Sequence, residues 1–291
     1  MVCGRRRVEW PRARDYDETQ NLGWIAHASR KEWTGTVEIL LTNDDGIYAP
    51  GLEALERELQ RLGHVTVVAP ATEQSGVGHS ITFLSPLICK EVYDGERRRG
   101  WAVEGSPADC VKIGIQKFCP QRPDLVVSGM NGGLNAGINV LYSGTVAAAI
   151  EGAFFGITSV AVSLEFDEHA QYGKAAAIAG AVIQQILAQK RLEPQLYNLN
   201  IPTAAIGQPT RLCVVPMSIL RYGERYIERK DPRGRTYYWA ASDPAPRPTG
   251  TVTDLSALEQ GCVTLTPLQY DMTDRAAMED MANWKFDWGS R

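Results

Sequence analysis

Short apolar runs alternate with longer amphipathic stretches through most of this chain, and this alternation constrains the fold more than any other feature. Strand-like apolar runs lie at 37–41, 64–70, 124–129, 159–164 and 196–202, with further strand-like pieces at 81–93 and 101–104. Stretches with helical spacing or helix-start signals lie at 51–63, 106–118, 143–156 and 170–189. Continuous apolar runs are typical of strands that are buried on both faces. The pattern therefore predicts an α/β fold with a mostly parallel sheet and helices on both of its faces.

Two of the expected helices have clear boundary signals. Pro50 stands where a first helical turn tolerates proline, and Gly63 ends the leucine-rich stretch that follows. Ser106, Pro107 and Asp109 form a capping-box pattern at the start of the other helix.

The two ends of the chain differ from this repeating centre. Residues 1–36 are rich in Arg, Trp, Asp and Glu and lack periodicity, which predicts a poorly ordered extension. A start codon chosen upstream of the natural one would explain them equally well. After residue 211, strand-like segments between Pro- and Gly-rich loops predict β-hairpins, and a helix is expected near 273–284. The strand-like segments are 211–216, 225–231, 234–241 and 262–268. We therefore expect an extension at 1–36, an α/β core at 37–210 and a β-rich extension at 211–291.

Composition excludes several classes of protein. The net charge of −4 and the absence of a large basic face argue against binding to duplex nucleic acid. The six cysteines, at positions 3, 89, 110, 119, 213 and 262, form no CxxC pair, so we interpret them as reduced thiols of a cytoplasmic protein. The Arg-rich N-terminus is not followed by an apolar segment, so no secretion signal is predicted. The apolar stretch 146–164 contains Glu151 and a break at Gly156, which favours a helix, a turn and a buried strand over a membrane span.

Polar, glycine-rich loops follow three of the expected strands. These loops are residues 43–46, 69–80 and 128–145. Ligands of open parallel sheets bind beyond the carboxyl ends of the strands, so the three loops are expected to converge on one site.

The adjacent carboxylates Asp44 and Asp45 have two interpretations. Asp-Gly sequences favour turns, and the doublet can be only that. Alternatively, the pair binds a hard divalent cation, Mg²⁺ or Mn²⁺, which would relieve the repulsion between them. The Ser75 hydroxyl and the Asn131 amide can add oxygen ligands, although each is also compatible with an ordinary loop or turn.

A phosphate site is expected on the third loop. Ser143, Gly144 and Thr145 lie at a predicted helix N-terminus, where free N–H groups and the helix dipole favour anions; plain N-capping is the alternative, and both can hold. His79 is either an acid or base or a hydrogen-bonding loop residue.

A cation beside a phosphate cradle suggests hydrolysis of phosphate esters. The chain lacks GxxxxGK[ST], GxGxxG after a strand and GxSxG, which argues against P-loop hydrolases, dinucleotide binding and serine esterases.

Several long motifs together resemble the SurE family of nucleotidases. They are ILLTNDDGIYAPGLEAL, VVAPATEQSGVGHSIT, GSPADCV, PDLVVSGMNGGLNAGINVLYSGTVAAAIEG and DPRGRTYYW, in an order that covers residues 38 to about 270. The resemblance implies a metal-dependent phosphomonoesterase acting on nucleoside 5′- and 3′-monophosphates, and on short polyphosphate in some members. It also implies a Rossmann-like core, one divalent cation per subunit, and dimers or tetramers that exchange β-rich C-terminal segments.

The resemblance also implies roles for single residues. Asp44, Asp45, Ser75 and Asn131 match metal ligands, Asp44, Asp45 and Asn43 match the catalytic group, and Asn135, Ser143, Gly144 and Thr145 match residues that line the phosphate pocket. The chain departs from the family pattern in its long N-terminal lead and in having Gly133-Leu134 where many members have Gly-Pro.

Two other functions remain open at this point. One is a phosphatase of sugars or other small metabolites on the same scaffold, since Tyr48 and Tyr142 serve equally well as base-stacking or packing residues. The other is a non-catalytic nucleotide-binding protein. Metal content and competition between a nucleotide and glucose 6-phosphate would separate the three functions.

Overall fold

The structure is a computed structural model that describes residues 36–189, 193–207, 210–220, 224–242 and 252–286. The expected N-terminal extension therefore lies almost entirely outside the described residues. Residues 37–291 cluster as one compact unit.

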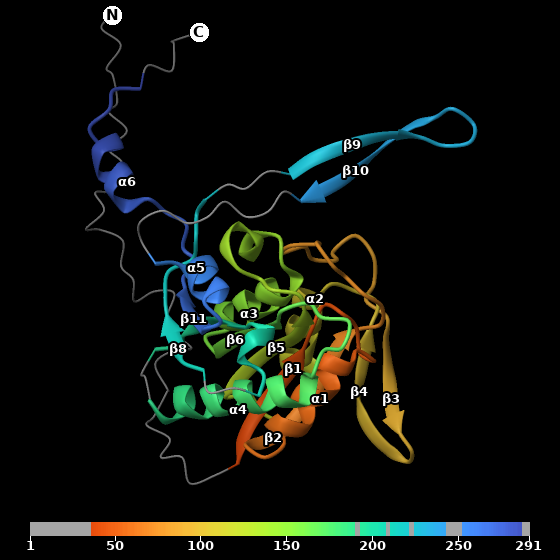
Figure 1. Cartoon of the computed structure of the whole chain (residues 1–291). Coiled ribbons are helices and arrows are strands. Elements are labelled where there is room, and N and C mark those ends of the chain that lie inside the picture. Colours follow the sequence, from red (N-terminus) through yellow and green to blue (C-terminus); the bar gives the residue numbers. More distant parts are fainter. Residues whose placement is uncertain (1–35, 190–192, 208–209, 221–223, 243–251, 287–291) are drawn as a thin grey trace, which may run out of the picture. The chain divides into compact units, whose positions relative to one another are not determined.

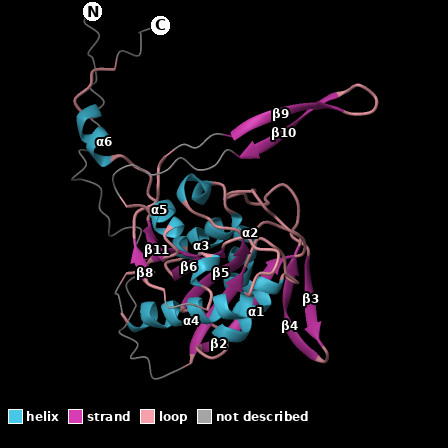
Figure 2. Ribbon diagram, in the orientation of Figure 1, coloured by secondary structure: helices cyan, strands magenta, loops and turns pink. Residues whose placement is uncertain are grey.

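A nine-stranded sheet forms the centre of this unit (Figures 1 and 2). Its strands are β1 (Val37–Thr42), β2 (Gly63–Pro70), β3 (Cys89–Asp94), β4 (Arg97–Val103), β5 (Leu125–Gly132), β6 (Thr158–Leu164), β7 (Leu196–Ile201), β8 (Leu212–Val214) and β11 (Val263–Leu268). The strand order is β3-β4-β2-β1-β5-β6-β7-β11-β8. The six strands from β4 to β7 in this order run parallel, while β3 is antiparallel to β4 and β11 is antiparallel to β7. The expected mostly parallel α/β fold is confirmed.

Six α-helices are described: α1 (Pro50–Leu59), α2 (Pro107–Ile113), α3 (Gly144–Phe154), α4 (Tyr172–Ala188), α5 (Asp254–Glu259) and α6 (Arg275–Met281). A π-helical turn, η1 (Gly114–Phe118), continues α2, and two 3-10 turns, η2 (Gly137–Leu141) and η3 (Thr203–Ala205), complete the helical elements. The capping box expected at Ser106 and Asp109 is confirmed, with hydrogen bonds of 3.1 and 2.9 Å in the two directions.

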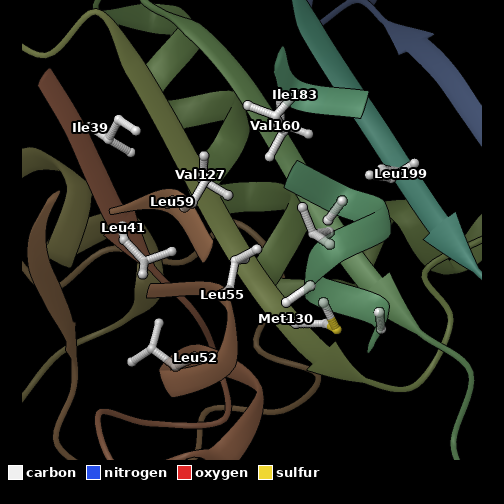
Figure 3. Close-up of a cluster of buried hydrophobic side chains, with 14 of the residues drawn as sticks. Ile39, Leu41, Leu52, Leu55, Leu59, Val127, Met130, Val160, Ile183 and Leu199 are labelled. Atoms are coloured by element: carbon white, nitrogen blue, oxygen red, sulfur yellow. The ribbon is translucent and has the colours of Figure 1, made fainter. Parts of the chain in front are cut away.

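Apolar side chains of single strands point alternately to two separate cores. Ile39 and Leu41 join a cluster with α1 and α4, which Figure 3 shows with Leu52 and Leu55 of α1 near the sheet. Leu40, between them in sequence, joins a second cluster with α2 and α3. A continuous apolar run is therefore explained by burial on both faces of the sheet.

Two expectations about strands need correction. The stretch 81–93 is strand only from Cys89, and residues 81–88 form a loop that exposes Phe83 and Leu84. The next strand begins at Arg97 rather than 101, because its first residues pair with β3 and Arg98 stacks on Trp101, which outweighs their charge. Apolar character alone therefore misplaced both boundaries.

The C-terminal segment contributes to two sheets. The strands β9 (Glu224–Lys230) and β10 (Thr236–Ser242) form the expected antiparallel hairpin, a two-stranded sheet of their own. The segments at 211–216 and 262–268 were expected in hairpins, but they supply β8 and β11 of the main sheet. The pairing of β11 with β7 over five residue pairs explains the difference, because an open sheet edge takes up any segment that can complete it.

Among the described residues, no helix combines the length and apolar character needed to cross a membrane. The apolar stretch 146–164 forms most of α3, a turn and β6, as expected.

Candidate active site

The turn after β1 presents the carboxylate doublet. Asn43 is fully buried, its side-chain Nδ2 donates to the Gly46 carbonyl at 2.9 Å, and its Oδ1 accepts from the Gly46 N–H at 3.2 Å. Gly46 has φ of +99°, a conformation that favours glycine. Asn43, predicted to belong to the catalytic group, uses both amide atoms to close this turn. The two interpretations of the doublet, a turn and a ligand site, are therefore compatible. Asn43 closes the turn, and the turn carries Asp44 and Asp45.

The Asp44 carboxylate contacts the first turn of α3. The Thr145 backbone N–H donates to Asp44 Oδ2 at 3.0 Å, and the Thr145 hydroxyl donates to Oδ1 at 2.5 Å. Gly144 permits this approach, because a Cβ there would lie 3.0 Å from the Asp44 Cβ. Burial raises the pKa of Asp44, and the hydrogen bonds from Thr145 oppose that rise. The helix end predicted to hold phosphate thus already holds a carboxylate.

Asp45 is the more accessible member of the doublet. Its Oδ2 accepts from the Gly132 backbone N–H at 3.1 Å. Burial, followed by the charge of Asp44, raises the pKa of Asp45 to about 6. Within the described part of the chain, no ion pair reaches either carboxylate. Two neighbouring carboxylates without a cationic partner make a site that would be stabilised by a bound cation.

Ser75 lies on the loop 71–82, which follows β2. The Gln74 backbone N–H donates to the Asp44 carbonyl oxygen at 2.7 Å, so this loop runs beside the doublet. Ser75 is exposed, and its hydroxyl donates to Glu73 Oε1 at 2.6 Å. The structure therefore brings the residue next to the site, with its hydroxyl turned to a neighbouring carboxylate.

Asn131 lies near the end of β5, directly before the glycine that hydrogen-bonds Asp45. Its Nδ2 donates to the Gly133 carbonyl at 2.7 Å, and its Oδ1 has no hydrogen-bond donor among the described residues. An amide oxygen without a described donor, one residue before the Gly132 contact with Asp45, suits a hard cation. No group of three His, Cys, Asp or Glu side chains in the described ranges can hold a metal, so a metal site here needs hydroxyl and amide oxygens.

The remaining predicted phosphate-binding residues have structural contacts. The Ser143 hydroxyl caps α3 by accepting from the Val146 N–H at 3.1 Å. Asn135 is 8% exposed; its Nδ2 donates to Ser163 Oγ at 2.9 Å, and its carbonyl accepts from the side chains of Asn198 and Asn200. Asn135 is therefore the centre of a buried polar network that shapes the loop before α3.

The sequence did not reveal two further contacts, one that fixes this loop and one that joins the loop 71–82 to α3. Asp254, at the start of α5, is fully buried and accepts from the Gly137 N–H at 2.7 Å and from the Ser218 N–H at 2.8 Å. His79 contacts Glu151 of α3 at 2.9 Å. The Thr253-Asp254 pair was a visible helix-start signal, but nothing local indicated its distant partner.

A cavity of about 630 Å³ lies along the loop 71–82, and neither Asp44 nor Asp45 lines it. It is lined by Ala71, Thr72, Gln74, Ser80, Ile81, Thr82, Lys90, Glu104, Gly105 and Ser106. Gln74 connects the cavity to the site, because it lines the cavity and its backbone hydrogen-bonds Asp44. Cavities of this size accommodate metabolite-sized ligands.

The mostly parallel sheet places the chain in the α/β fold class, with a carboxylate doublet at the carboxyl edge of that sheet. A family model described as "Survival protein SurE" matches residues 39–225, more than half of the chain. The chain is 55% identical over 249 residues to a "5'-nucleotidase SurE" of Rhodopirellula baltica, covering 85% of this chain and 98% of that protein. It is 43% identical over 256 residues to a "5'-nucleotidase SurE" of Pelobacter propionicus, covering 86% of this chain and all of that protein. The crystal structure of the SurE protein from Aquifex aeolicus matches with a TM-score of 0.75 and 36% identity, covering 84% of this chain and 98% of that chain. The chain belongs to the SurE family.

Proposed function

We propose that this chain is a 5′-nucleotidase, a phosphomonoesterase that hydrolyses nucleoside 5′- and 3′-monophosphates to nucleoside and phosphate in a reaction that depends on a divalent metal. The observation that carries the proposal is the pair of carboxylates Asp44 and Asp45, which contact the N-terminus of α3 and the end of β5 and have no cationic partner among the described residues. The two relatives reported above are named as 5′-nucleotidases, which supports the 5′-nucleotidase part of the proposal. Short polyphosphate is a further expected substrate.

The residues at the site fit one divalent cation per subunit. Asp44, Asp45, Ser75 and Asn131 would hold it, because they offer two carboxylates, a hydroxyl and an amide oxygen. The raised pKa of Asp45 agrees with this fit, because burial and then the charge of Asp44 disfavour the ionised carboxylate, and a bound cation would favour it. We propose Mg²⁺ or Mn²⁺, the cations that prefer oxygen ligands.

The chain's own residues orient the reactants. When bound, the cation would supply Lewis acidity toward a phosphoryl oxygen and toward water. Thr145 fixes both oxygens of Asp44, so this carboxylate enters the reaction already oriented. Asp45 keeps Oδ1 free of hydrogen-bond donors among the described residues, and this atom orients the attacking water. The Thr145 and Val146 N–H groups already donate to Asp44 and Ser143, so α3 would act on the phosphoryl oxygens through its dipole.

We propose that the cavity along the loop 71–82 receives the leaving nucleoside. Its volume suits a ribose with a base, and Gln74, Thr72 and Thr82 offer polar contacts there. Tyr48 and Tyr142 are exposed and remain candidates for stacking on the base. A cavity with this polar lining also admits sugar phosphates, which keeps a broad metabolite phosphatase as the second candidate function.

Phosphate release tests the proposal. The purified protein is assayed with 5′-AMP, 3′-AMP, glucose 6-phosphate, tripolyphosphate and an aryl phosphate, with Mg²⁺, Mn²⁺ or EDTA. We expect turnover that needs metal and favours the nucleotides, with glucose 6-phosphate as a poor competitor. Equal turnover of sugar phosphates would favour the broad phosphatase. No release from folded protein with either metal would favour a non-catalytic nucleotide-binding protein.

We also propose that the chain self-associates as a dimer or tetramer and acts in the cytoplasm. The hairpin of β9 and β10 supports association, because Tyr226, Tyr238 and Trp239 are exposed in the single chain and an isolated two-stranded sheet is marginally stable. The five described cysteines are free thiols, which suits a reducing compartment.

A further inference from the structure

We propose that His79 is a positioning residue that fastens the loop 71–82 to α3 and thereby fixes Ser75 beside the carboxylate doublet. The role of Ser75 as a ligand rests on the proposed function, whereas the attachment of the loop rests on contacts of the protein alone. His79 therefore acts through Ser75 rather than on the substrate.

The hydrogen bond of His79 joins the loop to two helices. His79 Nε2 lies 2.9 Å from Glu151 Oε2, and the Glu151 side chain is only 6% exposed. The other carboxylate oxygen of Glu151 lies 3.4 Å from Lys112 Nζ. Glu151 belongs to α3 and Lys112 to α2. The His79 side chain therefore attaches the loop to the two helices that pack on the same face of the sheet.

The imidazole ring is also packed. It stacks on Phe154 with ring centroids 5.5 Å apart and an interplanar angle of 16°, and Phe154 meets the edge of Tyr270. Glu151 and Phe154 follow Thr145 by six and nine residues, which is about 9 and about 13 Å along the axis of α3. His79 is therefore anchored away from the phosphate end of the helix, which argues against direct proton transfer to the substrate.

The loop has few other contacts close to Ser75. Before Ser75, the loop is fixed where the Gln74 N–H donates to the Asp44 carbonyl. After it, the Gly78 N–H donates to the Tyr142 carbonyl at 3.0 Å. Gly76 has φ of +71° and open space around its Cα. Farther along, the Ser106 hydroxyl donates to the Ser80 carbonyl at 2.7 Å, and the Thr82 N–H donates to Asp109 at 3.0 Å. The position of Ser75 therefore depends on anchor points at both ends, and His79 supplies the side-chain anchor nearest to Ser75 on the far side.

The first experiment reads the loop in metal-free protein. Hydrogen exchange of the Gly78 and Thr82 amides, which donate to Tyr142 and Asp109, is compared for the wild type, His79→Ala, His79→Gln and His64→Ala. Glutamine keeps a donor at the reach of Nε2, and His64 is a matched control, since it makes an equally short contact of 2.9 Å with Glu38 away from this loop. We expect exchange about tenfold faster in His79→Ala and near wild type in His79→Gln and His64→Ala. Unchanged exchange in His79→Ala would overturn the proposal.

The second experiment connects the loop to the ligand set. Affinity for Mn²⁺ alone is measured by calorimetry for His79→Ala, Ser75→Ala and the double variant. We expect each single variant to weaken binding by about tenfold, and the double variant to bind no more weakly than Ser75→Ala, because both changes act through one ligand. Additive losses would overturn the proposal.

Kinetics with 5′-AMP separate positioning from proton transfer. At saturating metal we expect His79→Ala to recover kcat to within about threefold of the wild type, with an unchanged pH profile and with rescue by His79→Gln. A loss of one limb of the pH profile, shared by His79→Gln, would show that His79 transfers a proton and would overturn the proposal. If the wild type releases no phosphate, the proposed function fails, while the exchange experiment still decides whether His79 anchors the loop.

Discussion

Thr145 shows how much of the site depends on single side chains. Its N–H and its hydroxyl hold the two oxygens of Asp44, a carboxylate that is only 4% exposed. Hydrogen bonds to charged groups are among the stronger ones in proteins, and a buried carboxylate that loses one is left short of donors. The residue expected to line a phosphate pocket therefore contributes first by orienting a proposed metal ligand.

We predict that Thr145→Val lowers kcat/KM for 5′-AMP by about 10- to 100-fold, since one charge-assisted hydrogen bond is lost at constant side-chain shape. Thr145→Ser keeps the hydroxyl and is expected to stay within about threefold of the wild type. Steady-state kinetics at saturating Mn²⁺ measure both variants. Equal activity of the valine and serine variants would contradict this role of the hydroxyl.

The pKa of Asp45 leads to a prediction about stability in the absence of metal. Because the pKa is raised from 3.8 to about 6, the folded protein holds a proton that the unfolded chain releases. The resulting stabilisation is present below about pH 4 and is lost as the pH rises through about 6. In EDTA at pH 7.5, Asp45→Asn should therefore be more stable than the wild type by about 1–2 kcal/mol, the full shift being reduced by solvent screening.

Urea unfolding of metal-free protein at pH 4.5 and pH 7.5 measures this effect. The stability difference between Asp45→Asn and the wild type is expected to shrink toward zero at the lower pH. A variant that is less stable than the wild type at pH 7.5 would mean that Asp45 makes a favourable contact as a carboxylate.

At the scale of elements, the loop before α3 is held by a contact with a distant segment. Asp254 is fully buried and receives N–H groups of Gly137, Ser218 and Leu255. We predict that Asp254→Ala destabilises the protein by about 3 kcal/mol or more, because several buried donors lose their acceptor. Asp274→Ala is the control: Asp274 caps α6 in an exposed position, so its loss should cost about 1 kcal/mol or less.

Unfolding in denaturant measures the stability loss of both variants. KM for 5′-AMP shows whether the loop before α3 has moved. An Asp254→Ala variant with the stability and KM of the wild type would contradict the role of this buried carboxylate.

Local sequence patterns predicted most of the core strands. They did not predict which strands pair with each other. The continuous apolar runs predicted β1, β2, β5, β6 and β7, because burial on both faces leaves a pattern within each strand. The three loops after β1, β2 and β5 were expected to converge. Hydrogen bonds of Asp44 with Thr145 and with the Gln74 N–H, and of Asp45 with Gly132, do bring all three together. The place of β8 and β11 was missed, because strand order depends on pairing with distant segments. The contact of Asp254 with Gly137 spans 117 positions and leaves no local signal.

At the scale of the whole molecule, the hairpin of β9 and β10 has no core of its own. Tyr237 and Trp239 share one face of it, and both are exposed in the single chain. We predict a mass above that of the monomer in light scattering at micromolar protein. Trp239→Asp should shift the protein toward the monomer, whereas Trp239→Phe should not, because only the former places a charge on the apolar face. A wild type that is monomeric throughout this range would contradict self-association through the hairpin.

The central claim is that the carboxylate doublet holds a metal and carries hydrolysis of nucleotides. Its most direct test is phosphate release from 5′-AMP by the wild type and by folded Asp45→Asn, both at saturating Mn²⁺ or Mg²⁺. The account predicts metal-dependent turnover by the wild type and a loss of at least about 100-fold in the variant, the effect of losing one key transition-state contact. Full turnover by Asp45→Asn at saturating metal would contradict it.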